Sequence, residues 1–353
     1  MTRCLPKTAV LLVLVLALAG CGRKSQPPAA SQAPKTLPNR IVRVLCYHNL
    51  VTTGGGFYDT TVETFQTQLK VLKDGGFQAI SCRQLSDYLA NVRDIPDKSV
   101  IITFDDGRSS VLGIAKPLLD KCGYVATLFP IVGSVGSKGN LTWEELKQLS
   151  AAGYEIGSHT VSHLNLTRRG SSSLQAWQDR VRDELEESFS TLVDKLGQPP
   201  VALAYPFGNY DTFTMRAAKD AGYQLAFSID PGVVDNQSDL WRLPRRMVVK
   251  GLSLSTFERS LVTEPLHLTE IEPAIGLHVG AKTVKLSAAP RDGSVMTGMQ
   301  AEVGAHSDLQ LDQEAGRLTV TATLRPGANL VRLWSPGPPW RETGWIIVSD
   351  ATR

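Results

Sequence analysis

The sequence lacks several features that would place it in common classes of protein. Its charge is nearly balanced, with 37 Lys and Arg against 34 Asp and Glu and a net charge of +3. No basic stripe alternates with aromatic residues, which argues against a nucleic-acid partner. It has one apolar run near its start and no second long one, which excludes several membrane spans. Disorder throughout is also excluded, because 42% of the residues are hydrophobic and 20% are charged.

Cysteine is scarce. The chain has five cysteines, and two of them, Cys4 and Cys21, lie in the N-terminal region. The other three are Cys46, Cys82 and Cys122. Three is an odd number, and their spacing is not that of metal-binding pairs, so we expect buried thiols and no disulfide framework.

Residues 1–21 have the pattern of a secretory signal. A basic start precedes eleven unbroken apolar residues, Ala9–Ala19, a run too short to span a bilayer, which takes roughly 20 helical residues. The run ends in Leu18-Ala19-Gly20-Cys21, which resembles the lipobox of bacterial lipoproteins. We therefore expect an exported protein anchored to a membrane through a lipid on Cys21. The alternative is an ordinary signal peptide with a coincidental cysteine.

Gly22 follows the lipobox, where an Asp would resemble an inner-membrane retention signal. If the source cell has two membranes, this favours the periplasmic side of the outer membrane. Residues 22–40 are rich in Pro, Ala, Ser and Gln and have almost no large apolar residue. Such a composition cannot form a core, so we expect a flexible tether.

From residue 41 to 265, short β-rich runs alternate with amphipathic helical patterns. The strands expected from these runs are 41–47, 77–81, 99–104, 125–130, 154–157, 201–205, 224–229 and 246–249. The helical patterns cover 61–74, 142–152, 171–196 and 211–221. Seven or eight strands alternating with helices predict an α/β fold with a parallel barrel. An open doubly wound sheet is less favoured, because no Gly-rich phosphate turn follows the first strand.

Two segments with polar side chains follow expected strands, where the working residues of a parallel barrel lie. Asp105 and Asp106 close the strand 99–104. Adjacent carboxylates there would repel each other unless a cation or a proton separates their roles, although an Asp-Asp-Gly turn is the plain alternative. His159 and His163 follow the strand 154–157. Four residues apart, they would share one face of a helical turn and could bind one metal ion together with a carboxylate.

A third segment, Tyr205-Pro206-Phe207-Gly208, follows the strand 201–205. Its turn would bring backbone amides and an aromatic ring to the same mouth of the barrel. A plain strand-to-helix turn capped by Asp211 is the alternative. The three segments together predict one site.

In this order, Thr103-Phe104-Asp105-Asp106-Gly107, Ser158-His159-Thr160 with His163, and Tyr205-Pro206-Phe207-Gly208 resemble the first three motifs of NodB-type polysaccharide deacetylases, carbohydrate esterase family 4. The resemblance covers roughly residues 41–260. It implies a distorted (β/α)7–8 barrel that removes N-acetyl groups from a glycan with a divalent metal, usually zinc. It also implies that Asp105 is the catalytic base and that Asp106, His159 and His163 hold the metal. The Phe207 N–H is then a candidate donor to the oxyanion.

The sequence departs from this family at two positions. Many members have an arginine two residues before the motif-three proline, where it orients the base, but this chain has Ala204. Arg245, in the pair Arg245-Arg246, is our candidate for its replacement, with a solvated strand end as the alternative. The histidine of the usual fifth motif is not clear: His267 is a candidate general acid, with a residue at a domain junction as the plainer interpretation. His48, at the end of the first strand, is a candidate residue of the same pocket, with a hydrogen bond to a neighbouring loop as the alternative.

From about Ile271 the helical patterns vanish. Six short β-rich runs separated by turn sequences predict a small all-β, sandwich-like domain over 271–350. Trp334, Trp340 and Trp345 cluster near its end. They could stack on sugar rings, but packing against the protein is the favoured interpretation.

The sequence therefore predicts an exported, metal-dependent hydrolase that removes N-acetyl groups from a polysaccharide outside the cytoplasm. The Tyr47-His48 pair and the Ala204-Tyr205 variant of motif three resemble most those of exported poly-N-acetylglucosamine deacetylases. Two alternatives stay open: an esterase acting on O-acetyl groups, and a non-catalytic glycan-binding lipoprotein with a degenerate site. A retaining glycosidase is disfavoured, because adjacent aspartates are poorly placed to flank a glycosidic bond. The sequence indicates no particular protein partner.

Overall fold

The computed structural model describes residues 36–293, 298–304, 311–312 and 316–350. The expected signal peptide with Cys21, and residues 22–35 of the expected tether, lie outside the described residues. None of the helices in the described part combines the length and the apolar character needed to cross a bilayer.

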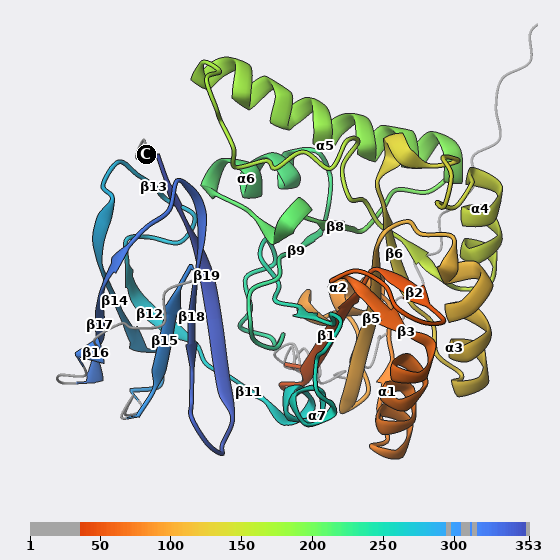
Figure 1. The fold of residues 1–353 in the computed structure, drawn as a ribbon, viewed down its shortest axis with the longest axis horizontal. Coiled ribbons are helices and arrows are strands. Elements are labelled where there is room, and N and C mark those ends of the chain that lie inside the picture. Colours follow the sequence, from red (N-terminus) through yellow and green to blue (C-terminus); the bar gives the residue numbers. More distant parts are fainter. Residues whose placement is uncertain (1–35, 294–297, 305–310, 313–315, 351–353) are drawn as a thin grey trace, which may run out of the picture. The chain divides into compact units, whose positions relative to one another are not determined.

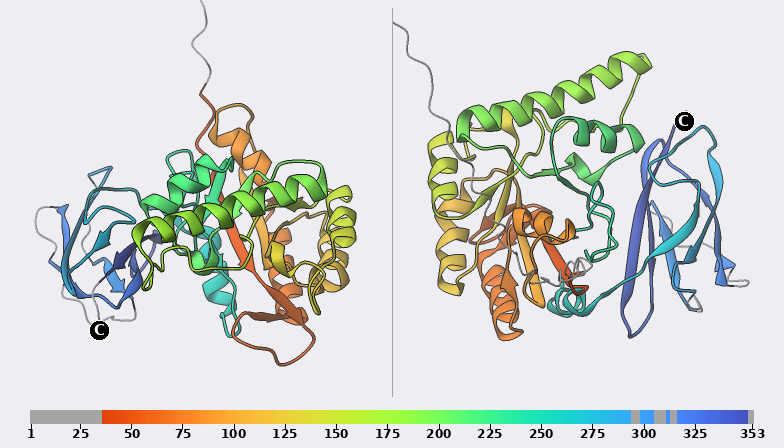
Figure 2. Two further views of the ribbon diagram at one scale, coloured as in Figure 1. Left: turned by 90° about the horizontal axis from the view of Figure 1, so that it is seen from above. Right: turned by 180° about the vertical axis from the view of Figure 1, so that it is seen from behind.

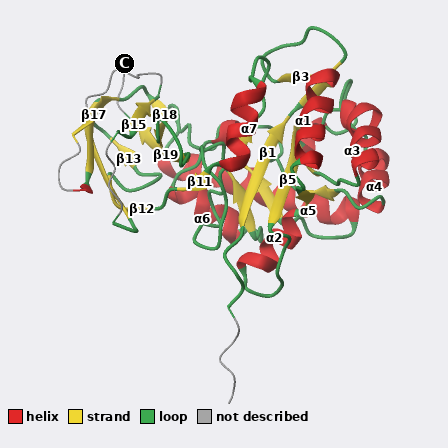
Figure 3. Ribbon diagram, turned by 90° about the horizontal axis from the view of Figure 1, so that it is seen from below, coloured by secondary structure: helices red, strands yellow, loops and turns green. Residues whose placement is uncertain are grey.

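A parallel β-sheet forms the centre of the first section of the chain (Figures 1 and 3). Its strands lie in the order β10–β1–β5–β6–β7, and β4 pairs with the start of β5. Their bounds are β1 (Ile41–Tyr47), β4 (Gln78–Ala79), β5 (Lys98–Asp106), β6 (Thr127–Pro130), β7 (Glu155–Ile156) and β10 (Arg246–Met247). The sequence predicts all six. Strand β5 is buried from Ser99 to Asp105, as expected of a strand that is covered on both faces.

The closed barrel is not formed as one continuous sheet. Strands β8 (Ala202–Ala204) and β9 (Leu225–Phe227) pair with each other in a separate parallel sheet. Single-residue bridges, Ser158 with Leu203 and Phe227 with Leu243, link this pair to its neighbours. The strands on this side have only two or three residues each, too few to carry a hydrogen-bonded ladder around a ring. The structure therefore confirms a mixed α/β fold with parallel strands but not the closed barrel.

Helices surround the parallel strands (Figures 1 and 2). The sequence predicts four of them: α1 (Val62–Asp74), α4 (Trp143–Ala151), α5 (Leu174–Leu196) and α6 (Thr212–Asp220). Three more had no clear pattern: α2 (Cys82–Leu89), α3 (Lys116–Cys122) and α7 (Leu254–Val262). Two of these have eight residues or fewer, and α3 continues from a π-helical turn, η1 (Val111–Ala115), which interrupts its periodicity. The start of α4 was predictable from its capping residues. The Thr142 hydroxyl accepts the Glu145 N–H in the expected capping box.

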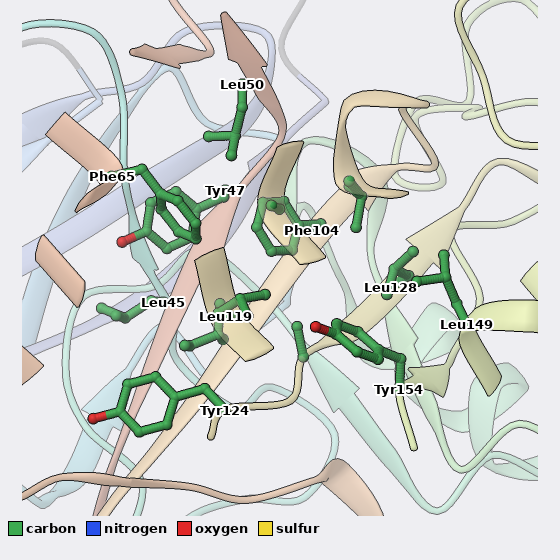
Figure 4. Packing of buried hydrophobic residues seen from close by; sticks show 14 of the residues in the cluster. Leu45, Tyr47, Leu50, Phe65, Phe104, Leu119, Tyr124, Leu128, Leu149 and Tyr154 are labelled. Atoms are coloured by element: carbon green, nitrogen blue, oxygen red, sulfur yellow. The ribbon is translucent and has the colours of Figure 1, made fainter. Parts of the chain in front are cut away.

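An aromatic core fixes the strand ends that lead into the polar segments (Figure 4). The Tyr47 ring lies 5.1 Å from that of Phe65 and 5.5 Å from that of Phe104, and all three are buried. Burying each such side chain contributes about 1.5–3 kcal/mol to stability. Because Tyr47 directly precedes His48, and Phe104 directly precedes Asp105, this packing sets where those two polar side chains begin.

The second section, the β section, begins at Glu264, before the expected boundary at 271. One sheet has the order β11–β19–β18–β15 with β13 beside β19, and the other has the order β12–β14–β17–β16. The strands are β11 (Glu264–Pro265), β12 (Leu268–Glu272), β13 (His278–Val279), β14 (Thr283–Pro290), β15 (Gln300–Val303), β16 (Leu311–Asp312), β17 (Leu318–Thr323), β18 (Gly327–Trp334) and β19 (Arg341–Ser349). Apolar residues of both sheets share one core, as a sandwich requires.

The tryptophans of this section pack against protein. Trp345 is buried in the shared core. Trp340 and Trp334 lie under the guanidinium groups of Arg259 and Arg332, at 5.1 and 4.8 Å. The favoured interpretation is thus correct for Trp345. Of the three cysteines in the described part, Cys46 and Cys82 are buried free thiols, as expected, but Cys122 is only half-buried.

Hydrogen bonds join the β section to the segment that links β8 to α6, and residues Leu37–Arg353 form one unit. The Tyr210 hydroxyl accepts the Ile346 N–H of β19 at 3.1 Å and donates to Asp230 at 2.6 Å. His278 of β13 lies 3.0 Å from Asp211, the residue that caps α6. Burial raises the pKa of Asp230 to about 7, because Arg242 and the hydrogen bond from Tyr210 offset the loss of water only in part.

Asp230 therefore makes stability depend on pH. Its carboxyl ionises near 3.8 when unfolded and near 7 when folded, so its contribution is full below about pH 4 and declines as the pH rises to about 7. The difference between these two pKa values corresponds to at most about 4 kcal/mol of stability. We expect Asp230→Asn to remove this decline in urea unfolding measured from pH 4 to 8. Asp183→Asn, an exposed carboxyl on α5, is the control that should retain it, and identical pH profiles for Asp230→Asn and the wild type would contradict this assignment.

Candidate active site

Polar side chains from several strand ends converge at one edge of the parallel sheet. Asp105 and Asp106 end β5, and His159 and His163 follow β7. Arg245 directly precedes β10, and His48 directly follows β1. The structure therefore brings together six residues that the sequence singles out.

The centre of the site is a buried ion pair between Asp105 and Arg245. The two guanidinium nitrogens of Arg245 meet the two carboxylate oxygens at 2.7 and 2.8 Å. Both side chains are almost fully buried. Two further bonds hold the guanidinium: Nε donates to the Ser228 carbonyl at 3.0 Å, and Nη1 donates to the Thr103 hydroxyl at 3.2 Å. Such a bidentate pair fixes both the position and the rotation of the carboxylate.

Arg245 also determines the charge of Asp105. Burial by itself would raise the pKa of this carboxyl, but the adjacent guanidinium outweighs burial and holds the pKa well below its usual range. The same pairing raises the pKa of Arg245, despite its burial. Asp105 is thus a carboxylate at neutral pH, and it can accept a proton but has none to give.

Asp106, His159 and His163 form a group suited to a divalent cation. One ligand atom from each lies within 4.8 Å of the other two. The His159 Nδ1 bonds to the Ala204 carbonyl at 2.8 Å, so Nδ1 carries the proton and Nε2 is left with a lone pair. That Nε2 lies 3.9 Å from the nearest oxygen of Asp106 and of Asp105. Two imidazoles and a carboxylate are the donor set of metal sites that keep positions open for water and substrate.

Both imidazoles are kept neutral, as cation binding requires. Burial lowers the pKa of His159 below its usual value, although Asp105 opposes the shift. Burial also lowers the pKa of His163. Cys46, His48 and Asp105 form a second group with similar spacing. In that group the negative charge of Asp105 is already compensated by Arg245. The first group is therefore the better cation site.

The expected helical turn between the two histidines is wrong. Residues 158–163 are irregular, and Thr160 and His163 have φ values of 64° and 60°. The segment is held from outside instead: Glu184 of α5 accepts the Val161 and Ser162 N–H groups at 3.0 and 2.9 Å. The two imidazoles still meet, with ring centroids 4.7 Å apart.

Left-handed backbone marks this site. Outside glycine, six described residues have positive φ, and four of them are Asp106, Thr160, His163 and Phe207. This conformation costs of order 1 kcal/mol or more per residue and persists only where the surrounding structure imposes it. Its concentration on these segments indicates that geometry here is maintained against local preference.

The motif-three turn lies beside the histidines. Tyr205 and Pro206 are buried, whereas Phe207 is 51% exposed and its ring lies 4.5 Å from that of His163. Gly208 has a φ of 69°, and a Cβ there would lie 2.2 Å from the Ile229 side chain. Only glycine fits at this position, so the Phe207-Gly208 backbone is tightly constrained.

His267 is not brought into this group. Its Nε2 lies 2.8 Å from Asp235, and it lines a different cavity, beside Arg291 and Glu342. Two other neighbours were missed. The Cys46 thiol donates to Asp105 at 3.4 Å, and Arg108 pairs with Asp106 at 3.1 Å. Their sequence signals were present but weak: Cys46 lies two residues before His48, and Arg108 follows the Asp-Asp-Gly motif.

The site combines an ionised base, a candidate cation site and a constrained backbone turn on an α/β fold of parallel strands. These features are typical of the active site of a hydrolase that uses water to attack a carbonyl group. A family model described as polysaccharide deacetylase matches residues 93–226. YxkH of Bacillus subtilis (strain 168), a protein assigned to the polysaccharide deacetylases, is 31% identical over 227 residues, 64% of this chain and 76% of YxkH. The chain belongs to the polysaccharide deacetylase family, enzymes that hydrolyse acetyl groups from glycans.

Other similarities agree. A poly-β-1,6-N-acetyl-D-glucosamine N-deacetylase of Staphylococcus aureus (strain MRSA252) is 27% identical over 198 residues, 54% of this chain and 68% of that protein. The Escherichia coli (strain K12) protein of the same name is 21% identical over 302 residues, 73% of this chain but 45% of its own length. In structure, the chain is similar to Streptococcus pyogenes deacetylase PplD in complex with acetate, with a TM-score of 0.57 and 26% identity over 64% of this chain and 99% of PplD.

Removal of Arg245 tests the ion pair. Arg245→Met leaves the Asp105 carboxylate buried without its partner, so we expect the free energy of unfolding to fall by about 3–5 kcal/mol. Adding Asp105→Asn should restore part of that loss, because the uncompensated charge is then gone. Urea unfolding of the two single variants and the double variant measures both effects. Arg182→Met, on the surface of α5, is the control and should change stability by less than about 1 kcal/mol; an equally small change for Arg245→Met would show that the pair does not stabilise the fold.

Proposed function

We propose that this protein removes N-acetyl groups from an extracytoplasmic polymer of N-acetylglucosamine, with zinc held by Asp106, His159 and His163. The observation that carries the proposal is the arrangement of an ionised, immobilised Asp105 beside this cation site. The similarity to relatives named as poly-β-1,6-N-acetyl-D-glucosamine N-deacetylases supports the choice of polymer.

In this mechanism a bound divalent cation would polarise the acetamide carbonyl and acidify the attacking water. Asp105 accepts the proton of that water. The pKa of Asp105 is low for a base, so the proton transfer depends on an acidified water. Arg245 keeps the carboxylate ionised and fixes its orientation. The Phe207 N–H is our candidate donor to the developing oxyanion, since the turn around it is fixed by Gly208.

A proton must also reach the amine that leaves. We assign this step to His48, because it lies at the mouth and its buried Nδ1 has no hydrogen-bond partner among the described residues. His267 is set aside for this role, because its imidazole is engaged with Asp235. The main argument for a non-catalytic binder was the absence of the motif-three arginine. That argument is weakened, because Arg245 pairs with Asp105 in its place.

Acetate release tests the reaction. We expect release from a β-1,6-linked N-acetylglucosamine pentamer, loss of release with a chelator, and recovery on adding Zn²⁺. Asp105→Asn should lower kcat by about 100-fold or more, because general-base catalysis contributes roughly that factor. Asp183→Asn, on the surface of α5, is the matched control and should be fully active. Faster release from O-acetylated xylo-oligosaccharides would instead establish the esterase. Absence of metal-dependent release from both substrates would favour the non-catalytic glycan-binding protein.

We further propose that the protein is exported and anchored to the cell envelope by a lipid on Cys21, at the outer membrane if the cell has two membranes. Residues 1–21 support this through their apolar run and lipobox. Cys21→Ser should abolish metabolic labelling with palmitate and move the protein from the membrane fraction to the soluble one. Cys122→Ser is the control for loss of a thiol. Unchanged labelling and fractionation of Cys21→Ser would rule out the anchor.

A further inference from the structure

Two neighbouring aromatic side chains stand exposed at the rim of the site. They lie at the end of the connection between β2 (Asn49–Val51) and β3 (Asp59–Thr61). Phe57 is 59% exposed and Tyr58 is 49% exposed. Among the described residues, the other strongly exposed aromatic is Phe207, in the motif-three turn of the same site. Exposed apolar surface that gathers at a catalytic mouth indicates a contact surface for a ligand.

The aromatic pair forms one wall of a cavity of about 310 Å³. Besides the two aromatic residues, the cavity is lined by His48, Asn49, Asp59, Asp106 and Arg108. Because it includes Asp106 and His48, it opens directly beside the reacting centre. Its volume lies at the lower end of the range for ligand sites, roughly 300–1,000 Å³, and suits a single ring rather than a long segment.

The wall is held in place before any ligand arrives. Asp59 accepts hydrogen bonds from the Asn49 amide at 2.9 Å and from the Gly56 N–H at 2.5 Å. Lys250 supports the loop from the other side: its N–H donates to the Phe57 carbonyl at 2.9 Å, and its ammonium group donates to the Gly55 carbonyl at 3.0 Å. A loop fixed in this way loses little conformational entropy on binding.

The rings are also fixed relative to each other and to the site. The Tyr58 ring packs on His48 with centroids 4.8 Å apart and planes 36° apart. The Phe57 ring stands almost perpendicular to it, at 5.0 Å and 85°. Tyr58 therefore connects the wall to the catalytic mouth, while Phe57 lies beyond it and is free to meet a ligand.

The lining combines apolar faces with polar groups, as an amphipathic ring requires. A pyranose has faces of C–H groups, which pack on aromatic rings, and a rim of hydroxyls, which can bond to Arg108 and Asp59. A polymeric substrate necessarily carries such a ring next to the one that reacts. We propose that Phe57 and Tyr58 form a subsite for the sugar adjacent to the reacting N-acetylglucosamine, which makes the enzyme prefer chains to single sugars. This inference rests on the proposed function.

Phe57→Ala tests the subsite without altering the catalytic residues. For the β-1,6-linked pentamer we expect KM to rise about 3- to 10-fold, the range of a single aromatic packing contact, with kcat unchanged. For monomeric N-acetylglucosamine, which cannot reach the wall, KM should not change. Phe57→Trp should retain the pentamer KM, and Leu174→Ala, which removes a side chain of similar exposure on α5, is the control.

Calorimetry separates this inference from the proposed function. The pentamer is titrated into the Asp105→Asn protein with and without Phe57→Ala, and we expect a similar 3- to 10-fold weakening of Kd. If the wild type releases no acetate, the proposed function fails, but this titration still reports on the subsite. A pentamer KM and Kd unchanged by Phe57→Ala, or equal losses for monomer and pentamer, would overturn the subsite.

Discussion

The site depends on one interaction, the buried ion pair between Asp105 and Arg245. Removing two charges from water costs several kcal/mol for each, and good geometry with additional hydrogen bonds is needed to offset that cost. Here the guanidinium meets both carboxylate oxygens, the Ser228 carbonyl and the Thr103 hydroxyl, and it lies over the rings of Phe129 and Phe227, 5.6 and 6.0 Å from their centroids. It thereby ties β5 to the segments after β9 and before β10, on the side where the strands are too short to form a continuous ladder.

The sequence was sufficient to predict most of the polar residues that meet, although not Cys46 or Arg108. Parallel strands bring their carboxyl ends to one edge, so Asp105, His159 and Tyr205 could be assigned to one site from their order along the chain. Arg245 was identified as the residue that compensates for Ala204, and the structure places its guanidinium on Asp105. The first of these predictions succeeded because it needed only the topology and not the geometry of any loop. The second rested on the pattern of the family that the motifs resemble.

The remaining features depend on contacts that local patterns do not encode. The spacing of His159 and His163 matches a helical turn, but Glu184, some twenty residues further on, holds their loop in another conformation. Cys46 reads as an ordinary buried thiol until β1 and β5 pair and bring it to Asp105. The aromatic wall was missed for the same reason, since Phe57 and Tyr58 belong to no periodic pattern and acquire meaning only beside His48 and Asp106.

The contacts of Tyr210 and Asp211 have a consequence for how this protein can have evolved. These residues end the motif-three turn, and their partners, the Ile346 N–H and His278, belong to β19 and β13. A turn supported in this way shares its framework with the β section. The β section is then not an interchangeable module: replacing it by an unrelated domain would withdraw hydrogen bonds from the motif-three turn. Selection on catalysis is thus expected to extend to residues of the β section that never meet the substrate.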